Sequence, residues 1–297
     1  MDVAEPGRHL SLHRGFLKVS EENIELGRVP LDDITALILS APQISMTKSL
    51  MVALAERKAV IVICGRNWHP VSMTLPFDVH YEAAGVLHDQ ISASEPLRKR
   101  LWQQIVRAKI GNQISALARH APGSPALEEL GILQRRVQSG DPTNMEAQAA
   151  RRYWPALMGA DFRRDRKDGD VNAFLNYGYT VLRAATARAV CGTGLHPALG
   201  LHHKSRINAF ALVDDLMEPF CPAVDSIAHE IVSESNTLGP EEKRRLASVL
   251  QEDMLAENGA SPVINCLSRI AQSLCASLKG GSTALAIPEM RPAGRLV

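Results

Sequence analysis

The hydrophobic pattern of this chain changes its period once, within the stretch 77–96. Before this stretch, apolar runs such as 36–39 and 60–64 have the length and β-branched composition of strands, and the second is typical of a buried strand. One helix, 46–57, interrupts them. After the change, apolar residues recur at helical spacing almost to the end of the chain. The sequence therefore predicts an α+β fold, with a β-rich first part and a larger all-α second part.

Breaks in this pattern divide the 297 residues into four segments. We expect an N-terminal β-rich domain at 1–77, a linker at 78–96, an α-helical domain at 97–278 and a flexible tail at 279–297. The tail is expected because Gly280-Gly281-Ser282 and three later breakers disfavour regular structure. Inside the helical domain, the pattern predicts a single helix at 241–257.

Composition excludes several classes of protein. Hydrophobic residues make up 45% of the chain, which is enough for a sizeable core. The five cysteines contain no Cys-x-x-Cys pair, which argues against a disulfide framework and a zinc knuckle. The first residues lack the pattern of a signal peptide, and no apolar run approaches the roughly 18 residues that cross a bilayer. We expect a soluble cytoplasmic protein with no membrane contact.

Charge is segregated along the chain although the net charge is only +1. The segment 151–206 has ten Lys and Arg against four Asp and Glu, and 207–260 has three against eleven. The predicted helix 97–120 carries six Lys and Arg and no acid. A basic band beside an acidic one suits a protein that binds a polyanion next to a carboxylate cluster. Ordinary solvated helix faces explain the same counts equally well.

The strongest sign of chemistry is a set of acids and histidines delivered by separate segments. Asp214 or Asp215 lies three or four residues from Glu218 on one predicted helical face, where like charges repel unless a cation offsets them. His202 and His203 precede this helix. Carboxylates with one imidazole favour Mg²⁺ or Mn²⁺, and phosphodiester chemistry is the natural reaction of such a metal beside a basic band. A lone histidine is more often structural.

Further candidate residues for chemistry or for contacts with nucleic acid lie between positions 146 and 206. Glu146 begins a predicted helix, where a first-turn glutamate is usually a capping aid. Tyr177 directly follows Asn176, whose amide is four residues from that of Asn172; the group indicates either a structural amide network or base stacking. The basic candidates for phosphate contacts are Arg151, Arg152, Arg163, Arg164, Lys204 and Arg206.

Four blocks, in order, resemble the CRISPR-associated integrase of the adaptation module (the "Cas-one" family), specifically its type II branch. The blocks are Asn144-x-Glu146 with Ala149-Ala150-Arg151-x-Tyr153-Trp154, Asn172-Ala173-x-Leu175-Asn176-Tyr177-Gly178-Tyr179, Gly194-Leu195-His196-Pro197-x-Leu199-Gly200-x-His202-His203, and Asp215-Leu216-Met217-Glu218-Pro219-Phe220-x-Pro222-x-Val224-Asp225. The resemblance covers the helical part, and the β-rich part agrees with the family in layout.

The resemblance implies a site and a reaction. The catalytic and metal-binding positions become Glu146, His203 and Glu218, with Asp215 as an auxiliary acid. The implied activity is that of a divalent-metal-dependent DNA endonuclease and integrase, in which a DNA 3′-hydroxyl attacks a backbone phosphate of a CRISPR array. This chain departs from the family at Cys221, where arginine is usual; that puts the charge balance around Glu218 in question, not a ligand.

The resemblance also implies partners. The substrates are double-stranded DNA with single-stranded 3′ ends, called a prespacer, and CRISPR repeat DNA. The N-terminal domain forms a homodimer, and two dimers clamp a dimer of a small companion protein ("Cas-two") in a prokaryotic cytoplasm. Other type II CRISPR proteins are further candidate partners. Two rival interpretations stay open: a non-catalytic DNA-binding scaffold subunit of the same complex, and a small-molecule metallohydrolase.

Overall fold

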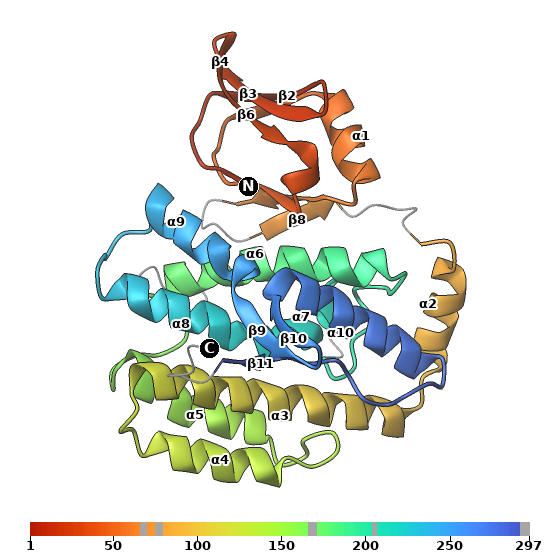
Figure 1. Cartoon of the computed structure of the whole chain (residues 1–297), viewed down its shortest axis with the longest axis vertical. Helices are drawn as coiled ribbons and strands as arrows, with labels where there is room; N and C mark the ends of the chain where they lie inside the picture. The colour runs from red at the N-terminus through yellow and green to blue at the C-terminus, as the bar shows by residue number, and fades with distance from the viewer. Residues whose placement is uncertain (66–69, 75–79, 166–170, 204–206, 292–297) are drawn as a thin grey trace. The chain divides into compact units, whose positions relative to one another are not determined.

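The computed structural model describes residues 1–65, 70–74, 80–165, 171–203 and 207–291. These residues form two compact units, Met1–Tyr81 and Glu82–Val297 (Figure 1). The first is rich in strands and the second is mostly helical, which confirms the predicted α+β class. Among the described residues, no helix is long and apolar enough to cross a membrane.

The first unit contains two four-stranded sheets with the orders β4-β3-β2-β6 and β1-β5-β7-β8. Arg14 and Gly15, and then Glu22 and Asn23, have positive φ and make the tight turns of the antiparallel β2-β3-β4 meander. The bounds are β1 Asp2–Val3, β2 Arg8–His13, β3 Phe16–Glu21, β4 Ile24–Pro30, β5 Ala36–Leu39, β6 Ile44–Met46, β7 Val60–Cys64 and β8 Pro70–Thr74.

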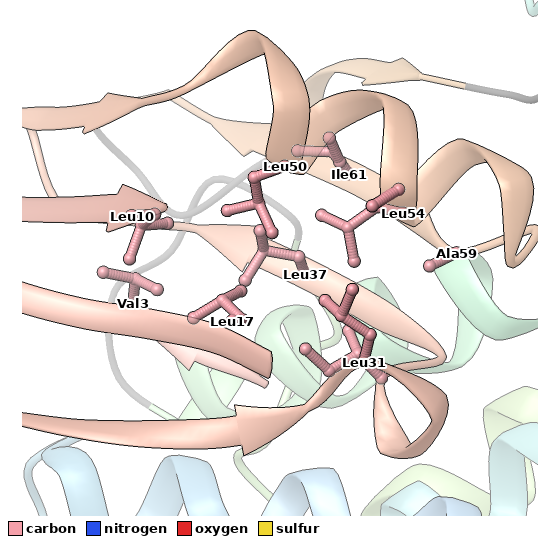
Figure 2. Close-up of a cluster of buried hydrophobic side chains, with 11 residues drawn as sticks. Val3, Leu10, Leu17, Leu31, Leu37, Leu50, Leu54, Ala59 and Ile61 are labelled. Carbon is pink, nitrogen blue, oxygen red and sulfur yellow. The ribbon is translucent and has the colours of Figure 1, made fainter. Parts of the chain in front are cut away.

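The core of this unit is built from both sheets and one helix (Figure 2). Leu10 and Leu17 come from one sheet, and Leu37 comes from the other. Helix α1 (Lys48–Glu56) contributes Leu50 and Leu54, and it follows β6 in the connection between the parallel strands β5 and β7. The predicted strands at 36–39 and 60–64 and the predicted helix between them are confirmed.

The second unit is organised around two long helices, α3 and α6 (Figure 1). Both pack against the segment that runs through α7, the short 3-10 helix η2 and α8, while α3 also packs against α4 and α5. The bounds are α2 Ala83–Ser92, α3 Glu95–His120, α4 Ala126–Arg136, α5 Met145–Met158, α6 Val171–Gly192, α7 Ala211–Met217, η2 Glu218–Phe220, α8 Cys221–Val232, α9 Pro240–Ala247 and α10 Val263–Leu278.

The second unit is not purely helical, contrary to the prediction. The expected helix 241–257 is instead α9, the 3-10 helix η3 (Ser248–Gln251) and strand β9 (Asp253–Ala256). Strand β9 pairs with β10 (Gly259–Pro262) and β11 (Glu289–Met290). Met254 is buried whereas its neighbours are exposed, which is the alternation of a strand and not of a helix.

Two further segments contain more structure than the sequence indicated. Helix α2 lies within 78–96, expected as a linker. Within 279–297, expected as a flexible tail, β11 pairs with β9, and Asn112 of α3 bonds the backbone of Pro288 and Met290. These contacts attach the segment to the helical unit as far as Met290.

Candidate metal centre

Glu146 lies in the first turn of α5, but it does not cap that helix. Asp141 accepts hydrogen bonds from the backbone N–H groups of Met145 (2.8 Å) and Glu146 (3.0 Å). Asn144, in the left-handed conformation with φ 53°, accepts from Ala147 N at 3.1 Å. The orphan N–H groups of the helix start are therefore satisfied by other side chains. The Glu146 carboxylate is therefore not used for capping, and it bonds a residue of α3 instead.

Lys109 of α3 joins Glu146 to Glu218. Its Nζ lies 2.6 Å from Glu146 Oε1 and 2.6 Å from Glu218 Oε2. Glu218 is the first residue of η2, and α3 packs against both η2 and α5. Helix packing thus places two carboxylates from segments 72 positions apart around one ammonium group.

His203 is oriented by Asp215, which is 0% exposed. The two Asp215 oxygens accept from His203 Nδ1 (2.5 Å) and from the backbone N–H groups of Leu201 (2.6 Å) and His202 (3.0 Å). Because Nδ1 is engaged by Asp215, Nε2 is the ring nitrogen left for a metal. Gly200 permits this close approach, since a Cβ there would lie 2.6 Å from His203 O and 2.9 Å from Asp215 Oδ2.

His202 has a different role from its neighbour. Its ring stacks face to face on buried Trp102 of α3, with centroids 4.4 Å apart and an interplanar angle of 3°. His203 meets the same indole edge-on at 5.8 Å. The stack orients His202 toward the indole, while Asp215 holds His203. This geometry favours His203 as the ligand of the pair.

The charges of the site are interdependent. Burial lowers the pKa of Lys109, but the Glu218 and Glu146 carboxylates outweigh it and leave the pKa raised. Burial raises the pKa of Glu146, but Lys109 outweighs it and leaves the pKa lowered. For Glu218, burial dominates and the pKa is raised. The hydrogen bond to Asp215 raises the pKa of His203, with further contributions from Glu218 and Glu146. Glu146, Glu218 and His203 therefore share one electrostatic environment.

This donor set fits a divalent metal ion. The ammonium group between Glu146 and Glu218 shows that their oxygens converge on one cation, and the His203 ring is close enough for both carboxylates to raise its pKa. Two carboxylates and an imidazole suit Mg²⁺ or Mn²⁺. Within the described part of the chain, however, no three acid, histidine or cysteine side chains already form a metal cage. Lys109 occupies the position between the two carboxylates.

Asp214 and Asp225, the other acids of the segment 214–225, bond side chains outside the candidate site. Arg183 donates from Nη2 to Asp214 at 2.9 Å, and Asn208 donates to the same oxygen at 2.8 Å. Asp225 is buried and accepts hydrogen bonds from Tyr153 Oη (3.1 Å) and from Tyr179. Neither acid is free to hold a metal.

Cys221, where the resemblance leads one to expect arginine, is buried at the start of α8. Its thiol donates to Met217 O at 3.5 Å. Lys109 supplies the cation next to Glu218, and tyrosines satisfy Asp225. The substitution at Cys221 thus leaves neither acid without a partner.

The predicted DNA contacts are distributed unevenly. Arg151, Arg152 and Arg163 are exposed, and Arg152 pairs with Glu129 at 2.6 Å. Arg164 binds Asn172 (2.8 Å) and Asn176 (2.7 Å), so the amides form the structural network considered above.

Of the remaining predicted DNA contacts, one is buried and two lie outside the residues that the structure describes. Tyr177 is 1% exposed, because it lies on the buried face of α6; in this conformation its ring is a core group and cannot stack on a base. Lys204 and Arg206 lie outside the described residues.

Three contributors were missed by sequence reasoning: Lys109, Trp102 and Asp141. Lys109 was counted with the basic residues of the helix 97–120, as a candidate phosphate contact. A signal was present, since Lys109 lies four residues after Ile105 and three after Val106, both of which are buried. A lysine on the apolar stripe of a helix predicts an internal partner.

Comparison with known proteins supports the family assignment. Residues 1–254 match the family model described as "CRISPR associated protein Cas1". The chain is 36% identical over 294 residues to a CRISPR-associated endonuclease Cas1 from Neisseria meningitidis serogroup C (strain 8013), covering 98% of this chain and 96% of that protein.

Two solved structures share the fold. A casposase bound to integration product has a TM-score of 0.81 at 18% identity, over 100% of this chain and 95% of that chain. A Cas6-RT-Cas1–Cas2 complex matches with a TM-score of 0.77 at 20% identity, over 99% of this chain and 36% of the matched chain.

Proposed function

The chain belongs to the Cas1 family, the CRISPR-associated endonucleases and integrases of CRISPR adaptation, and we propose that it acts through one divalent metal ion held by Glu146, His203 and Glu218. One observation carries this proposal: carboxylates from two separate segments converge on a single cation beside an oriented histidine. We propose Mg²⁺ or Mn²⁺ as the ion, because oxygen ligands dominate the set.

The side chains divide the work. When bound, the metal would polarise a phosphate and stabilise an oxygen nucleophile. Glu146 and Glu218 supply negative charge, and His203 supplies Nε2. Asp215 keeps the proton of the neutral imidazole on Nδ1 and fixes the ring orientation. No serine or cysteine nucleophile is required, because the attacking oxygen belongs to DNA.

The proposed reaction is a transesterification. The terminal 3′-oxygen of a prespacer forms a new bond to a phosphorus atom at the border of a CRISPR repeat, and the existing bond from that phosphorus to the 3′-oxygen of the repeat strand breaks. The proton of the attacking hydroxyl is lost and the departing 3′-oxygen gains one, so phosphodiester bonds are conserved. Exposed Arg151, Arg152 and Arg163 are proposed phosphate contacts, together with Lys204 and Arg206.

The proposed substrates are double-stranded DNA with single-stranded 3′ ends and repeat DNA. We propose that the β-rich unit forms a homodimer and that two dimers clamp a Cas2 dimer in a prokaryotic cytoplasm, with other type II CRISPR proteins as further candidate partners. The four sequence blocks support assignment to the type II branch. A shared fold with a chain of a Cas6-RT-Cas1–Cas2 complex is consistent with this assembly. Integration into a repeat-bearing plasmid, with and without the companion protein, tests it.

Strand joining tests the metal site directly. The full chain is incubated with Mn²⁺ and branched DNA. Glu146→Gln and Glu218→Gln are compared with Glu241→Gln, whose exposed carboxylate pairs with Arg244. We expect the first two variants to lose joining and cleavage by at least about 100-fold, and the control to retain both. Parental activity in Glu146→Gln and Glu218→Gln would favour the non-catalytic scaffold function.

A further inference from the structure

Lys109 has an unusual environment for a lysine. Its side chain is 14% exposed, and its Nζ lies 2.6 Å from one oxygen of Glu146 and 2.6 Å from one oxygen of Glu218. Helix α3 itself is held in place on this side, because Ile105 and Val106, which share a helical face with Lys109, are fully buried. Both carboxylates are themselves mostly buried, with side chains 23% and 19% exposed.

This arrangement conflicts with simultaneous binding of a metal ion. The ammonium is bonded to the same two carboxylates that the proposed metal site requires, and a divalent ion on those oxygens would lie within a few ångströms of it. Like charges at that separation in a mostly buried site repel strongly. A lysine has four rotatable side-chain bonds, so its ammonium can move aside while α3 remains in place.

We propose that Lys109 is a tethered cation that competes with the divalent metal ion for Glu146 and Glu218, so that metal binding displaces its ammonium. Lys109 then determines the metal concentration at which the site fills. This inference rests on the metal site proposed above. Lys109 lies outside the four sequence blocks, and its contacts with the two glutamates then act in metal binding as well as in an internal ion pair.

A purely structural ion pair makes a different prediction. If Lys109 only held α3, α5 and η2 together, its loss would destabilise the fold and leave metal affinity unchanged or weakened. If Lys109 competes with metal, replacing it with an uncharged side chain of similar length tightens metal binding, whatever happens to stability. Metal affinity therefore separates the two roles.

The test measures Mn²⁺ dissociation constants on the full chain without DNA, from the electron paramagnetic resonance signal of the free ion. We expect Lys109→Met to bind at least about tenfold more tightly than the parent, because a neighbouring unit charge is removed. Lys109→Arg, which keeps the charge, is expected to bind no more tightly than the parent. Lys99→Met is the matched control: it lies on the same helix, pairs with exposed Glu95 at 2.9 Å, and is expected to leave affinity unchanged.

A second measurement uses the parent protein, so it does not depend on a variant folding. Reductive methylation followed by mass spectrometry reports how fast each lysine amine reacts. We expect saturating Mn²⁺ to accelerate the labelling of Lys109 and to leave Lys99 unchanged. Unaccelerated labelling of Lys109, or a folded Lys109→Met that binds Mn²⁺ no more tightly than the parent, would overturn the inference.

The metal site itself is tested in the same titration by Glu218→Gln. If the parent does not bind Mn²⁺ saturably, or if Glu218→Gln binds it as well as the parent does, the proposed metal site fails. If Glu218→Gln loses binding but Lys109→Met gains none, only the role of Lys109 fails.

Discussion

Replacing Asp215 with asparagine is the sharpest perturbation of the site that the structure offers. His203 Nδ1 donates to Oδ1 at 2.5 Å, and Leu201 N donates to Oδ2 at 2.6 Å. An asparagine amide has one oxygen, so in either orientation its NH₂ group faces a donor. If the amide oxygen keeps the hydrogen bond from Leu201 N, the NH₂ group points at His203 Nδ1. Nδ1 must then accept a hydrogen bond from this NH₂ group. The proton of the neutral imidazole moves to Nε2, the nitrogen proposed for the metal.

The magnitude follows from these contacts. At least one charge-assisted hydrogen bond to a fully buried carboxylate is lost, which is expected to cost about 2 kcal/mol in the free energy of unfolding. Removing a partner that orients a ligand typically weakens metal binding about 10–100-fold. We therefore expect Asp215→Asn to remain folded, to bind Mn²⁺ about 10–100-fold more weakly, and to lose strand joining at Mn²⁺ concentrations that saturate the parent.

The pH dependence gives a second observation. The hydrogen bond to Asp215 raises the pKa of His203, so protonated His203 stabilises the fold fully below its unfolded pKa of about 6.5, and this contribution is lost as pH rises through the raised pKa. Metal requires the neutral ring, so Mn²⁺ affinity in the parent falls as pH drops through the raised pKa. In Asp215→Asn this fall is expected at lower pH.

Urea unfolding and Mn²⁺ titration on the same samples separate stability from binding. Asp214→Asn is the matched control, because Asp214 is adjacent and half-buried but bonds Arg183 and Asn208. We expect it to lose stability and to keep its Mn²⁺ affinity. Asp215→Asn with an Mn²⁺ dissociation constant within twofold of the parent would refute the role assigned to Asp215.

Substitutions at three further positions, Gly200, Trp102 and Asp225, test neighbouring features. Gly200→Ala is expected to lower the free energy of unfolding by about 1–3 kcal/mol and to weaken Mn²⁺ binding, because its Cβ would lie 2.6 Å from His203 O. Gly123→Ala is the control, because a Cβ at Gly123 would have nothing within 4 Å. Equal loss of stability of the two variants in urea unfolding would contradict the expectation. Trp102→Ala is expected to lower the free energy of unfolding by about 3–5 kcal/mol and to weaken Mn²⁺ binding. Trp102→Phe keeps an aromatic face for His202 and is expected to recover part of the stability and part of the Mn²⁺ affinity. If phenylalanine recovers no metal affinity, the stack does not position the histidines. Burial raises the pKa of Asp225 to about 7 against an ordinary 3.8, so its contribution to stability is fully present below about pH 4 and is lost, by about 4 kcal/mol, as pH rises to about 7. Asp225→Asn is expected to flatten unfolding free energy over this range, and an unchanged slope would count against it.

Much of the fold follows from local pattern. The strands at 36–39 and 60–64 and the helix between them are predictable because period and residue type agree. The β9–β10 hairpin was missed because acids and leucines at 241–252 resemble an amphipathic helix that continues. Asn258-Gly259 was the available signal: Gly259 has φ 103°, a conformation that glycine adopts at little cost.

The site was predictable only in part. The resemblance that the motif blocks carry predicts Glu146, His203 and Glu218 as a set. The blocks do not contain Lys109, which lies on another helix and meets the two glutamates only because α3 packs against α5 and η2. Tyr177 shows the converse limit. In the linear sequence, a tyrosine next to amides suggests a binding surface. In the folded chain Tyr177 is buried on α6, so it is not part of a surface.

The acids of the segment 214–225 show why the site forms where it does. Like charges so close in sequence repel, and each needs its own compensation in the folded chain. The structure provides a different partner for each: Arg183 for Asp214, backbone N–H groups and His203 for Asp215, Lys109 for Glu218, and two tyrosines for Asp225. Of these partners, Lys109 also compensates an acid from another helix, Glu146. In the proposed site, a divalent ion would replace that ammonium and still neutralise both carboxylates. At Asp214 or Asp225, the same exchange would break a contact that holds helices together and would bring in no second carboxylate.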